Sequence, residues 1–442
     1  MENKYQFRCR KCGNIIKNFS EWFEVGQKCP DCSGKFVYTE YSDHISKIKD
    51  LISERSSKAE SVFHYFDFLP LNDKSNIITE GEGVIPVDRW EFLEEYARIR
   101  FNKDCKVFAY RNDDNYGTGT FKDVAAALVA SILKENNIKQ YAVASTGNIA
   151  NAFAHYLALA GISLAVFIPQ DALKANEAGI GSYGQRVFRV NGDYAMAKKI
   201  AAEYSERHGI LLSGGNIDPM RVEAKKTMVF EWLRLMGELP DVYIQALSGG
   251  TGPIAIEKGC DEIEELGLFN KRPRYILVQP DKCDPMTAAW NDAKAAGFPE
   301  GWGNNYPVYE NPETLIPTLA TGNPVTFPII GEVVKNSDGE IISSHEEDVS
   351  DIARLIAYET TVKIGPAAAI AVGGFFESLK QGLIRDGESI MINVGEGVRR
   401  SPELMDDMIY TTKYVDSVNE CEPADRELFK KQLWEAMDKY SR

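Results

Sequence analysis

Short apolar runs alternate with helix-length amphipathic segments along most of the chain. The run at 163–168 is almost wholly apolar, as is typical of a strand buried on both faces of a parallel sheet. Strands separated by helices predict a doubly wound α/β architecture. Turn residues bound each predicted strand, at 141–144, 163–168, 185–190, 242–247, 275–279 and 390–394.

Residues 140–170 contain no Asp, Glu, Lys or Arg and therefore resemble a membrane segment at first sight. Turn residues at 145–148 and Gly161 divide the stretch into strand, turn, helix and strand. Each piece is too short to cross a bilayer. We therefore expect a buried part of an α/β core here.

The pattern divides the chain into five parts. We see no internal repeat and no low-complexity tract. The segment at 76–87 predicts the entry loop and first strand of a catalytic core, and the expected active site lies between two lobes. The predicted parts are an N-terminal ribbon at 1–40, a helical linker at 41–75, a large lobe at 76–122 and 216–405, a small lobe at 123–215, and a helical tail at 406–442.

Composition indicates a globular protein with more than one domain. Of 442 residues, 44% are hydrophobic and 26% charged, which is ordinary for a folded chain. The net charge of -15 argues against a general nucleic-acid binder, because binding to a phosphate backbone needs clustered Lys and Arg. The first residues are polar rather than a leader-like apolar run. We expect a cytoplasmic protein with neither a membrane nor a nucleic acid as partner.

Four of the eight cysteines have the spacing of a metal site. Two Cys-x-x-Cys pairs, Cys9 with Cys12 and Cys29 with Cys32, predict a four-thiolate zinc ribbon. Four thiolates would leave no open position on the ion, so the predicted role is structural. A rubredoxin-like iron site fits the same spacing, and two disulfides are the remaining alternative. The other cysteines have no disulfide-framework spacing, which favours a reducing compartment.

Three short segments carry the candidate chemistry, at 117–123 (GTGTFKD), 144–148 (ASTGN) and 248–252 (SGGTG). Lys122 stands at the start of one predicted helix. The glycine turn opens another, where backbone N–H groups and the helix dipole favour an anion. A lysine amine with a phosphate cradle is what pyridoxal phosphate (PLP) requires. Each segment alone is commonly a solvated lysine or a surface loop, so the prediction depends on their combination.

The turn at 145–148 is the candidate substrate site. We expect Ser145, Thr146 and Gly147 to bind a substrate carboxylate and Asn148 to reach the ring of the cofactor. The predicted cofactor cradle comprises Ser248, Gly249, Gly250, Thr251 and Gly252.

From about residue 80 to 402 the chain resembles PLP enzymes of the tryptophan-synthase-β type (fold type II), and within them the threonine synthase branch. Five ordered blocks carry the resemblance, at 120–123, 145–148, 216–227, 248–252 and 314–324. The resemblance implies that Lys122 forms the Schiff base with PLP and acts as general base, and that Asn148 contacts the ring oxygen. It also implies a phospho-amino acid substrate, a small nucleophile, released phosphate and a homodimer. An N-terminal ribbon is frequent in this branch.

Two positions depart from the threonine synthase pattern. Val124 follows the Lys-Asp pair where that branch usually has Arg, and Val394 stands where a hydroxyl usually meets the pyridine nitrogen. Either Glu396 reaches that nitrogen, or the ring stays unprotonated and is a weaker electron sink. Making threonine from phosphohomoserine needs extended proton transfer, so these departures favour phosphoserine.

The cysteate-forming relatives of threonine synthase, which combine phosphoserine with sulfite, are similar in several further segments. Their similarity lies at 152–155, 245–252 and 286–290, whereas 314–324 is more similar to threonine synthase itself. We expect cysteate formation or another phosphoserine β-replacement. Threonine synthesis, an elimination or deamination, and a non-catalytic PLP-binding relative remain alternatives.

Four further residues have two interpretations each. His155 is a packed core histidine or a cleft residue, and Glu223 is a cofactor neighbour or a surface carboxylate. Arg399 and Arg400 hold phosphate or sulfite, or they are an exposed basic pair.

Overall fold

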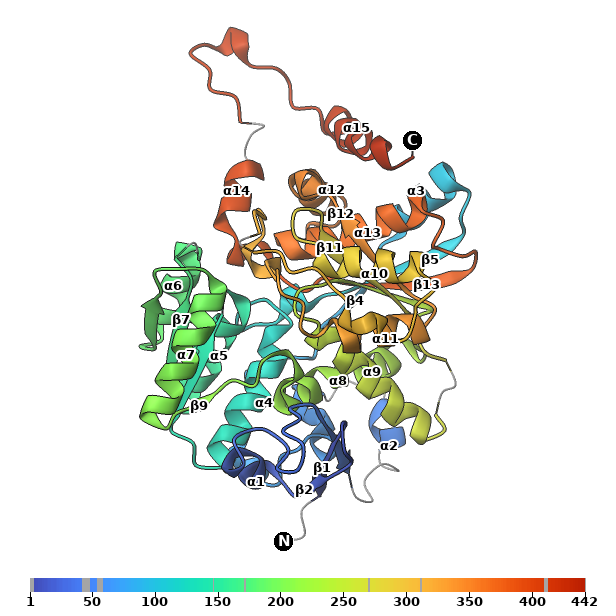
Figure 1. Ribbon diagram of the computed structural model, residues 1–442. Coiled ribbons are helices and arrows are strands. Elements are labelled where there is room, and N and C mark those ends of the chain that lie inside the picture. Colours follow the sequence, from blue (N-terminus) through green and yellow to red (C-terminus); the bar gives the residue numbers. More distant parts are fainter. Residues whose placement is uncertain are drawn as a thin grey trace.

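The computed structural model describes residues 4–41, 48–53, 59–145, 147–170, 172–268, 271–310, 312–408 and 412–441, and these form three sheets surrounded by helices (Figure 1). The N-terminal sheet is antiparallel, in the order β2-β1-β3. Its strands are β1 (Tyr5–Cys9), β2 (Ile15–Ile16) and β3 (Val37–Tyr41), and α1 (Phe19–Glu24) lies between β2 and β3 in the chain.

The largest sheet has six strands in the order β12-β11-β10-β13-β5-β4. Its ladders are parallel except for the edge strand β4, which is antiparallel to β5. The strands are β4 (Val87–Arg89), β5 (Cys105–Tyr110), β10 (Val242–Ala246), β11 (Arg274–Pro280), β12 (Glu340–Ser344) and β13 (Glu388–Asn393).

Both faces of this sheet are buried, because successive side chains of a strand point to opposite faces. Ile244 and Ile276 belong to one apolar cluster, with the helices α3 (Glu91–Phe101), α12 (Val349–Thr360) and α13 (Pro366–Lys380). Tyr243 and Tyr275 belong to another. That cluster includes α8 (Pro219–Met236), α9 (Thr251–Glu265), α10 (Pro285–Ala295) and α11 (Phe327–Asn336).

The third sheet is parallel, in the order β8-β7-β6-β9. Its strands are β6 (Gln140–Ala144), β7 (Ser163–Ile168), β8 (Arg186–Arg189) and β9 (Leu211–Leu212). One face packs on α4 (Lys122–Glu135) and α5 (Asn148–Leu159), and the other on α7 (Tyr194–His208). Helix α6 (Lys174–Ser182) joins β7 to β8 in the chain. Residues 140–170 thus form β6, α5 and β7, as expected from the turns at 145–148 and 161.

The N-terminal sheet does not have a core of its own. Phe7, Phe19 and Trp22 belong to the same apolar cluster as Val124 and Leu128 of α4. The segment after the sheet contains α2 (Ile48–Ser53) and a 3₁₀ helix (Val62–Phe68). Helix α4 begins with the candidate catalytic lysine, so the N-terminal sheet packs against the helix that positions it.

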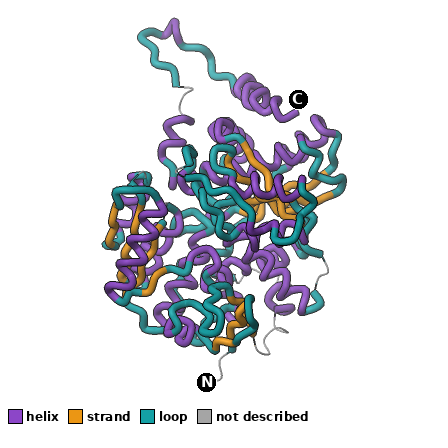
Figure 2. The backbone as a smooth tube through the Cα atoms, viewed as in Figure 1, coloured by secondary structure: helices purple, strands orange, loops and turns teal. Residues whose placement is uncertain are grey.

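Near the other end of the chain lie α14 (Pro402–Met408), the loop at 412–425 and α15 (Arg426–Met437), which packs on α12 (Figures 1 and 2). Tyr440 belongs to the apolar cluster in which α12 and α13 pack on one face of the large sheet. Within the described part of the chain, helices of the length and apolarity needed to traverse a bilayer are not found.

Candidate active site

Lys122 is the first residue of α4, at the end of a tightly hydrogen-bonded loop. The carboxylate of Asp123 accepts hydrogen bonds from the Thr118 amide (2.9 Å), the Thr118 hydroxyl (2.8 Å) and the Thr120 amide (3.3 Å). Burial raises the pKa of Asp123 to about 6, against the effect of those hydrogen bonds. The Asp that follows the lysine thus fixes the loop that presents it.

The loop is attached to the end of β13. The Phe121 amide donates to the Gly395 carbonyl (3.1 Å), and the Gly397 amide donates to the Gly119 carbonyl (2.9 Å). Thr120 and Glu396 form an antiparallel bridge between the two segments. Two segments that are far apart in the sequence therefore place Glu396 close to Lys122.

Each carboxylate oxygen of Glu396 accepts one hydrogen bond. It accepts from the side-chain amide of Asn148, at the start of α5, and from the Ala367 backbone amide at 2.9 Å. Burial raises the pKa of its carboxyl, while these two donors and Lys122 oppose that rise. The Asn148 Oδ1 atom is buried without a partner among the described residues. The structure thus brings Lys122, Asn148 and Glu396 together, and Glu396 faces Asn148.

Lys122 is also close to helix α8. Its Nζ atom lies 3.9 Å from the centroid of the Phe121 ring, and the Nζ atom of Lys225 lies 4.2 Å from the same centroid. Burial and the guanidinium of Arg221 lower the pKa of Lys122 to about 7, against the pull of Glu396. An amine with that pKa exchanges protons readily near neutral pH.

The glycine turn precedes α9, and side chains approach it closely. A Cβ atom at Gly249 would stand 1.9 Å from the Asn216 amide nitrogen, and one at Gly252 would stand 2.3 Å from Gln245 Oε1. Gly250 has φ +80, a left-handed conformation that favours glycine. The turn therefore needs its glycines, and backbone N–H groups at the start of a helix suit a phosphate.

Side chains from other segments support this turn. Thr251 Oγ1 donates to Asn216 Oδ1 (3.2 Å), Ser248 and Thr321 share a hydroxyl hydrogen bond (2.8 Å), and Thr326 Oγ1 donates to the Gly249 carbonyl (3.0 Å). Sequence reasoning did not assign roles to the three supporting residues. Two of them, Asn216 and Thr321, lie inside blocks that carry the family resemblance, and this was the available signal.

The predicted substrate turn lies at the start of α5. Ser145 Oγ accepts from the Gly147 amide at 3.1 Å, whereas Thr146 lies outside the described residues. A Cβ atom at Gly147 would stand 2.9 Å from Thr318 Cγ2. The 314–324 segment therefore lies against this turn, and the close approach requires glycine.

The other residues with two interpretations have defined partners. His155 lies on α5, and its Nε2 atom contacts the carboxylate of Glu80. Its side chain is 11% exposed. Glu223 is buried, so the surface interpretation is wrong, and it accepts from the Tyr41 hydroxyl (2.6 Å) and from Lys226. Arg399 donates to the Asn115 carbonyl (2.8 Å), and Arg400 donates to Asn151 Oδ1 (3.0 Å).

The four clustered cysteines form a possible metal centre. The ligand atoms of Cys9, Cys12, Cys29 and Cys32 all lie within 4.8 Å of one another, and all eight cysteines are free thiols. The Cys9–Cys32 and Cys12–Cys29 sulfurs are 3.5 Å apart. A tetrahedral ion with zinc–sulfur bonds near 2.3 Å would place its sulfurs about 3.8 Å apart, so the donor set fits zinc.

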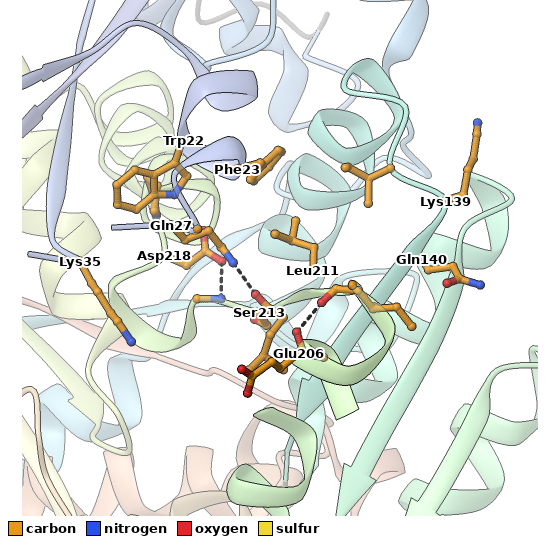
Figure 3. A pocket seen from close by; sticks show the side chains of 18 of the residues that line it. Trp22, Phe23, Gln27, Lys35, Lys139, Gln140, Glu206, Leu211, Ser213 and Asp218 are labelled. Carbon is orange, nitrogen blue, oxygen red and sulfur yellow. Dashed lines mark hydrogen bonds between the residues drawn. The ribbon is translucent and has the colours of Figure 1, made fainter. Parts of the chain in front are cut away.

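A cavity of about 760 Å³ lies elsewhere, between the N-terminal sheet and the third sheet (Figure 3). Gln27 crosses it and donates to the Leu212 carbonyl at 2.7 Å. Asp218 at its edge accepts from the Gly214 amide (3.1 Å) and caps α8. Lys122, Asn148 and the glycine turn are not among its lining residues. We therefore place the chemistry at Lys122 and not in this cavity.

Comparison with known proteins agrees with the geometry. The sequence profile described as "Pyridoxal-phosphate dependent enzyme" matches residues 78–395. The chain is 28% identical over 399 residues to the threonine synthase of Methanocaldococcus jannaschii, covering 89% of this chain and 92% of that protein. It is 29% identical over 410 residues to the cysteate synthase of Methanothrix thermoacetophila, covering 90% and 92%.

Among solved structures, maize serine racemase matches with a TM-score of 0.59 at 19% identity, covering 74% of this chain and 92% of that one. This likeness concerns the fold. Together with the matched profile, it shows that the chain belongs to the pyridoxal-phosphate-dependent enzyme family, in the fold type II, threonine synthase branch, where cysteate synthases are close relatives.

Proposed function

We propose that the enzyme replaces the phosphate of an O-phospho-L-amino acid by a small nucleophile, and that its reaction is O-phospho-L-serine plus sulfite to L-cysteate plus phosphate. Relatives named cysteate synthase, at 27% and 29% identity over 90% of the chain, support this reaction. Relatives named threonine synthase match equally long stretches, so the choice between the reactions depends on the site.

One observation carries the choice of phosphoserine. Val394 is buried in an apolar cluster at the end of β13, and the Glu396 carboxylate is engaged by Asn148 and the Ala367 amide. Val394 offers no hydroxyl to a ring nitrogen, and Glu396 is already held by two donors from other segments. A weaker electron sink suits a replacement at Cβ, which needs removal of the α-proton only. Threonine formation needs proton transfers at further carbons.

We assign a separate role to each part of the site. Gly249, Gly250 and Gly252 of the turn would hold the cofactor phosphate, Lys122 would hold the cofactor covalently, and Asn148 would contact its ring oxygen. When bound, PLP supplies an electron sink for the bond broken at Cα. Lys122, with its lowered pKa, takes the α-proton as general base. The turn at 145–147 orients the substrate carboxylate.

Threonine synthase is the second candidate, with O-phospho-L-homoserine and water as substrates. The segment at 314–324, which resembles that branch, lies against Gly147 and thus at the predicted carboxylate turn. We further propose a structural zinc ion on the four clustered cysteines, a homodimer, a cytoplasmic location and the five-part domain organisation predicted above.

Phosphate release tests the proposal. Purified enzyme with PLP is assayed with phosphoserine and with phosphohomoserine, each with and without sulfite, and the amino acid product is identified. We expect release from phosphoserine that depends on sulfite and yields cysteate. Threonine made from phosphohomoserine would favour the second candidate. Lys122→Ala is the control for phosphate released without the enzyme's chemistry.

A further inference from the structure

Lys225 is a buried lysine without an acceptor. Its side chain is 0% exposed, and its Nζ atom has no hydrogen-bond acceptor among the described residues. Its Nζ atom lies 4.2 Å from the centroid of the Phe121 ring, and the Nζ atom of Lys122 lies 3.9 Å from the same centroid. Burial and the positive charges of Lys122 and Arg221 push the pKa of Lys225 well below its ordinary value.

The next residue of α8 shows what a buried lysine ordinarily needs. Lys226 is also 0% exposed, but its Nζ atom donates to Glu223 and, at 2.7 Å, to Glu262. Further along the helix, Arg234 is paired with Glu231 at 2.7 Å. A buried charge is expensive unless it is paired and hydrogen-bonded. Lys225 differs from its neighbours because none of the described residues supplies it with a hydrogen-bonded counter-charge.

A second buried donor lies one helical turn away. Arg221 donates through its terminal nitrogen to the Gly215 carbonyl at 2.8 Å, while its Nε atom has no acceptor among the described residues. Residues at positions i and i+4 share one helix face, so Lys225 and Arg221 present their donors to the same side of α8. On this side Lys225 lies beside Lys122, over the same aromatic ring, and the charge of Arg221 is close enough to lower the pKa of Lys122. Both cationic side chains therefore act on the region beside the reacting lysine.

We infer that Lys225 binds a phosphate dianion beside Lys122 and that Arg221 adds positive charge to the same position. This inference rests on the proposed function for the identity of the anion, which is the phosphate of the substrate or that of the cofactor. Both are tetrahedral and doubly charged, and both match an ammonium group that can donate three hydrogen bonds.

For a phosphoserine substrate the subsite would stabilise the leaving group. The α-proton goes to Lys122, the electron pair of the Cα–H bond becomes a Cα=Cβ double bond, and the pair of the Cβ–O bond leaves on the phosphate oxygen. The nucleophile then adds to Cβ, and Cα regains a proton. Lys225 donates hydrogen bonds to the phosphate while the negative charge on that oxygen grows. Lys225 would thus lower the barrier to leaving and would select substrates whose leaving group is doubly charged.

The test compares wild-type holoenzyme with Lys225→Gln and Lys225→Arg. Isothermal titration measures the binding of inorganic phosphate to the holoenzyme, and an absorbance titration measures the binding of PLP to the apoenzyme. Lys134→Gln, on the same helix as Lys122 and bonded to the Ser75 carbonyl, is the matched control. We expect Lys225→Gln to weaken phosphate binding at least about tenfold, and Lys225→Arg and Lys134→Gln to weaken it less than about threefold.

The two titrations distinguish the two sources of phosphate. Weaker phosphate binding with unchanged PLP affinity supports the substrate as the source. Weaker PLP binding with unchanged phosphate binding supports the cofactor. No change of either in Lys225→Gln overturns the inference. Wild-type enzyme that turns over neither phospho-amino acid, but loses phosphate binding in Lys225→Gln, refutes the proposed function and leaves the subsite standing.

A thermal measurement on the apoenzyme provides an independent check. Lys225→Met replaces the unpaired amine by an apolar side chain of similar length, so we expect its melting temperature to exceed that of the wild type. Added phosphate should then raise the melting temperature of the wild type but not that of Lys225→Met. An equal rise in both proteins would contradict the assignment of Lys225 as the ligand.

Discussion

The side-chain amide of Asn148 donates a hydrogen bond to the carboxylate of Glu396, although 248 residues separate the two in the chain. Asn148 begins α5, beside the third sheet, and Glu396 follows the last strand of the large sheet. The contact therefore ties the predicted ring-oxygen ligand to the residue that was the candidate partner of the ring nitrogen. It makes Glu396 a support for Asn148.

Because of this contact, we expect Glu396→Gln and Val394→Thr to have different effects. Glu396→Gln keeps the size of the side chain but removes the charge that Asn148 and the Ala367 amide bind, so we expect a marked loss of turnover. Val394→Thr places a hydroxyl in an apolar cluster, which costs roughly 1–3 kcal/mol of unfolding free energy if the hydroxyl has no partner. Urea denaturation with and without PLP measures that cost.

If the cofactor nitrogen lies within reach of residue 394, PLP should restore the stability of Val394→Thr. Equal and unchanged activity in both variants, with phosphohomoserine accepted as well as phosphoserine, would contradict the preference for phosphoserine.

The covalent attachment of the cofactor should map to Lys122. Borohydride reduction of the enzyme with PLP, followed by peptide mapping, is expected to place the label on Lys122, and Lys122→Ala should lose the visible absorbance and the turnover. PLP should still bind weakly to that variant through the glycine turn. A label on Lys134 or Lys258 would show that the lysine was wrongly chosen, and wild-type protein without the absorbance would favour a non-catalytic relative.

The pKa of Lys122 predicts how fast the apoenzyme captures PLP at different pH. Because burial lowers this pKa to about 7, the reactive neutral amine is the minor form below that pH. The rate of capture should rise about tenfold per pH unit below pH 7 and level off above it. Stopped-flow absorbance measures the rate. A rate that continued to rise toward pH 10 would indicate an ordinary, exposed lysine.

The lowered pKa of Lys122 also determines how the free energy of unfolding depends on pH. The pKa of Lys122 is lower in the folded than in the unfolded chain, whose model value is 10.5. Between about pH 7 and 10.5 the unfolded chain therefore binds more protons, so the contribution of Lys122 to stability improves as the pH rises through this range. Lys122→Met should flatten that part of the stability profile of the apoenzyme.

The clustered cysteines predict about one zinc ion per chain. Cys29→Ser should lower the zinc content and reduce the free energy of unfolding by on the order of 4 kcal/mol, because loss of a metal is among the costliest changes. Cys421→Ser, at an exposed cysteine, is the control. Elemental analysis and denaturant titration measure the two effects. Protein that holds no metal and forms two disulfides would contradict the prediction.

The sequence predicted the central strands because burial on both faces makes them continuous apolar runs. Six of the expected strands are observed as β6, β7, β8, β10, β11 and β13, whereas the first strand expected within 76–87 begins only at Val87, as β4. Strand β5 was missed because Lys106 interrupts its apolar pattern, and β12 because its sequence, EIISS, is largely polar. With two residues, β9 is too short to give a periodic signal, and with three residues β4 is too short for its bounds to be predicted.

Some residues of the candidate site were predictable from the sequence, and others were not. Lys122, Asn148 and the glycine turn were found because they stand in local motifs at helix starts. Lys225 was not found, because a lysine inside a helix ordinarily lies in solvent and only tertiary packing determines that this one is buried. The pairing of Asn148 with Glu396 was likewise invisible, since contacts between distant segments leave no local pattern.

Helix α8 joins most of these features, and this limits how the enzyme can move. Sixteen of its 18 residues are buried. Two hydrogen bonds connect it to other segments: the Tyr41 hydroxyl donates to Glu223, and Lys226 donates to Glu262. Bending it would pull paired charges apart in an apolar interior, so its local unfolding should be as costly as global unfolding. We therefore expect α8 to stay intact in any motion that opens the site, and its amides to be among the slowest in the protein to exchange with deuterium.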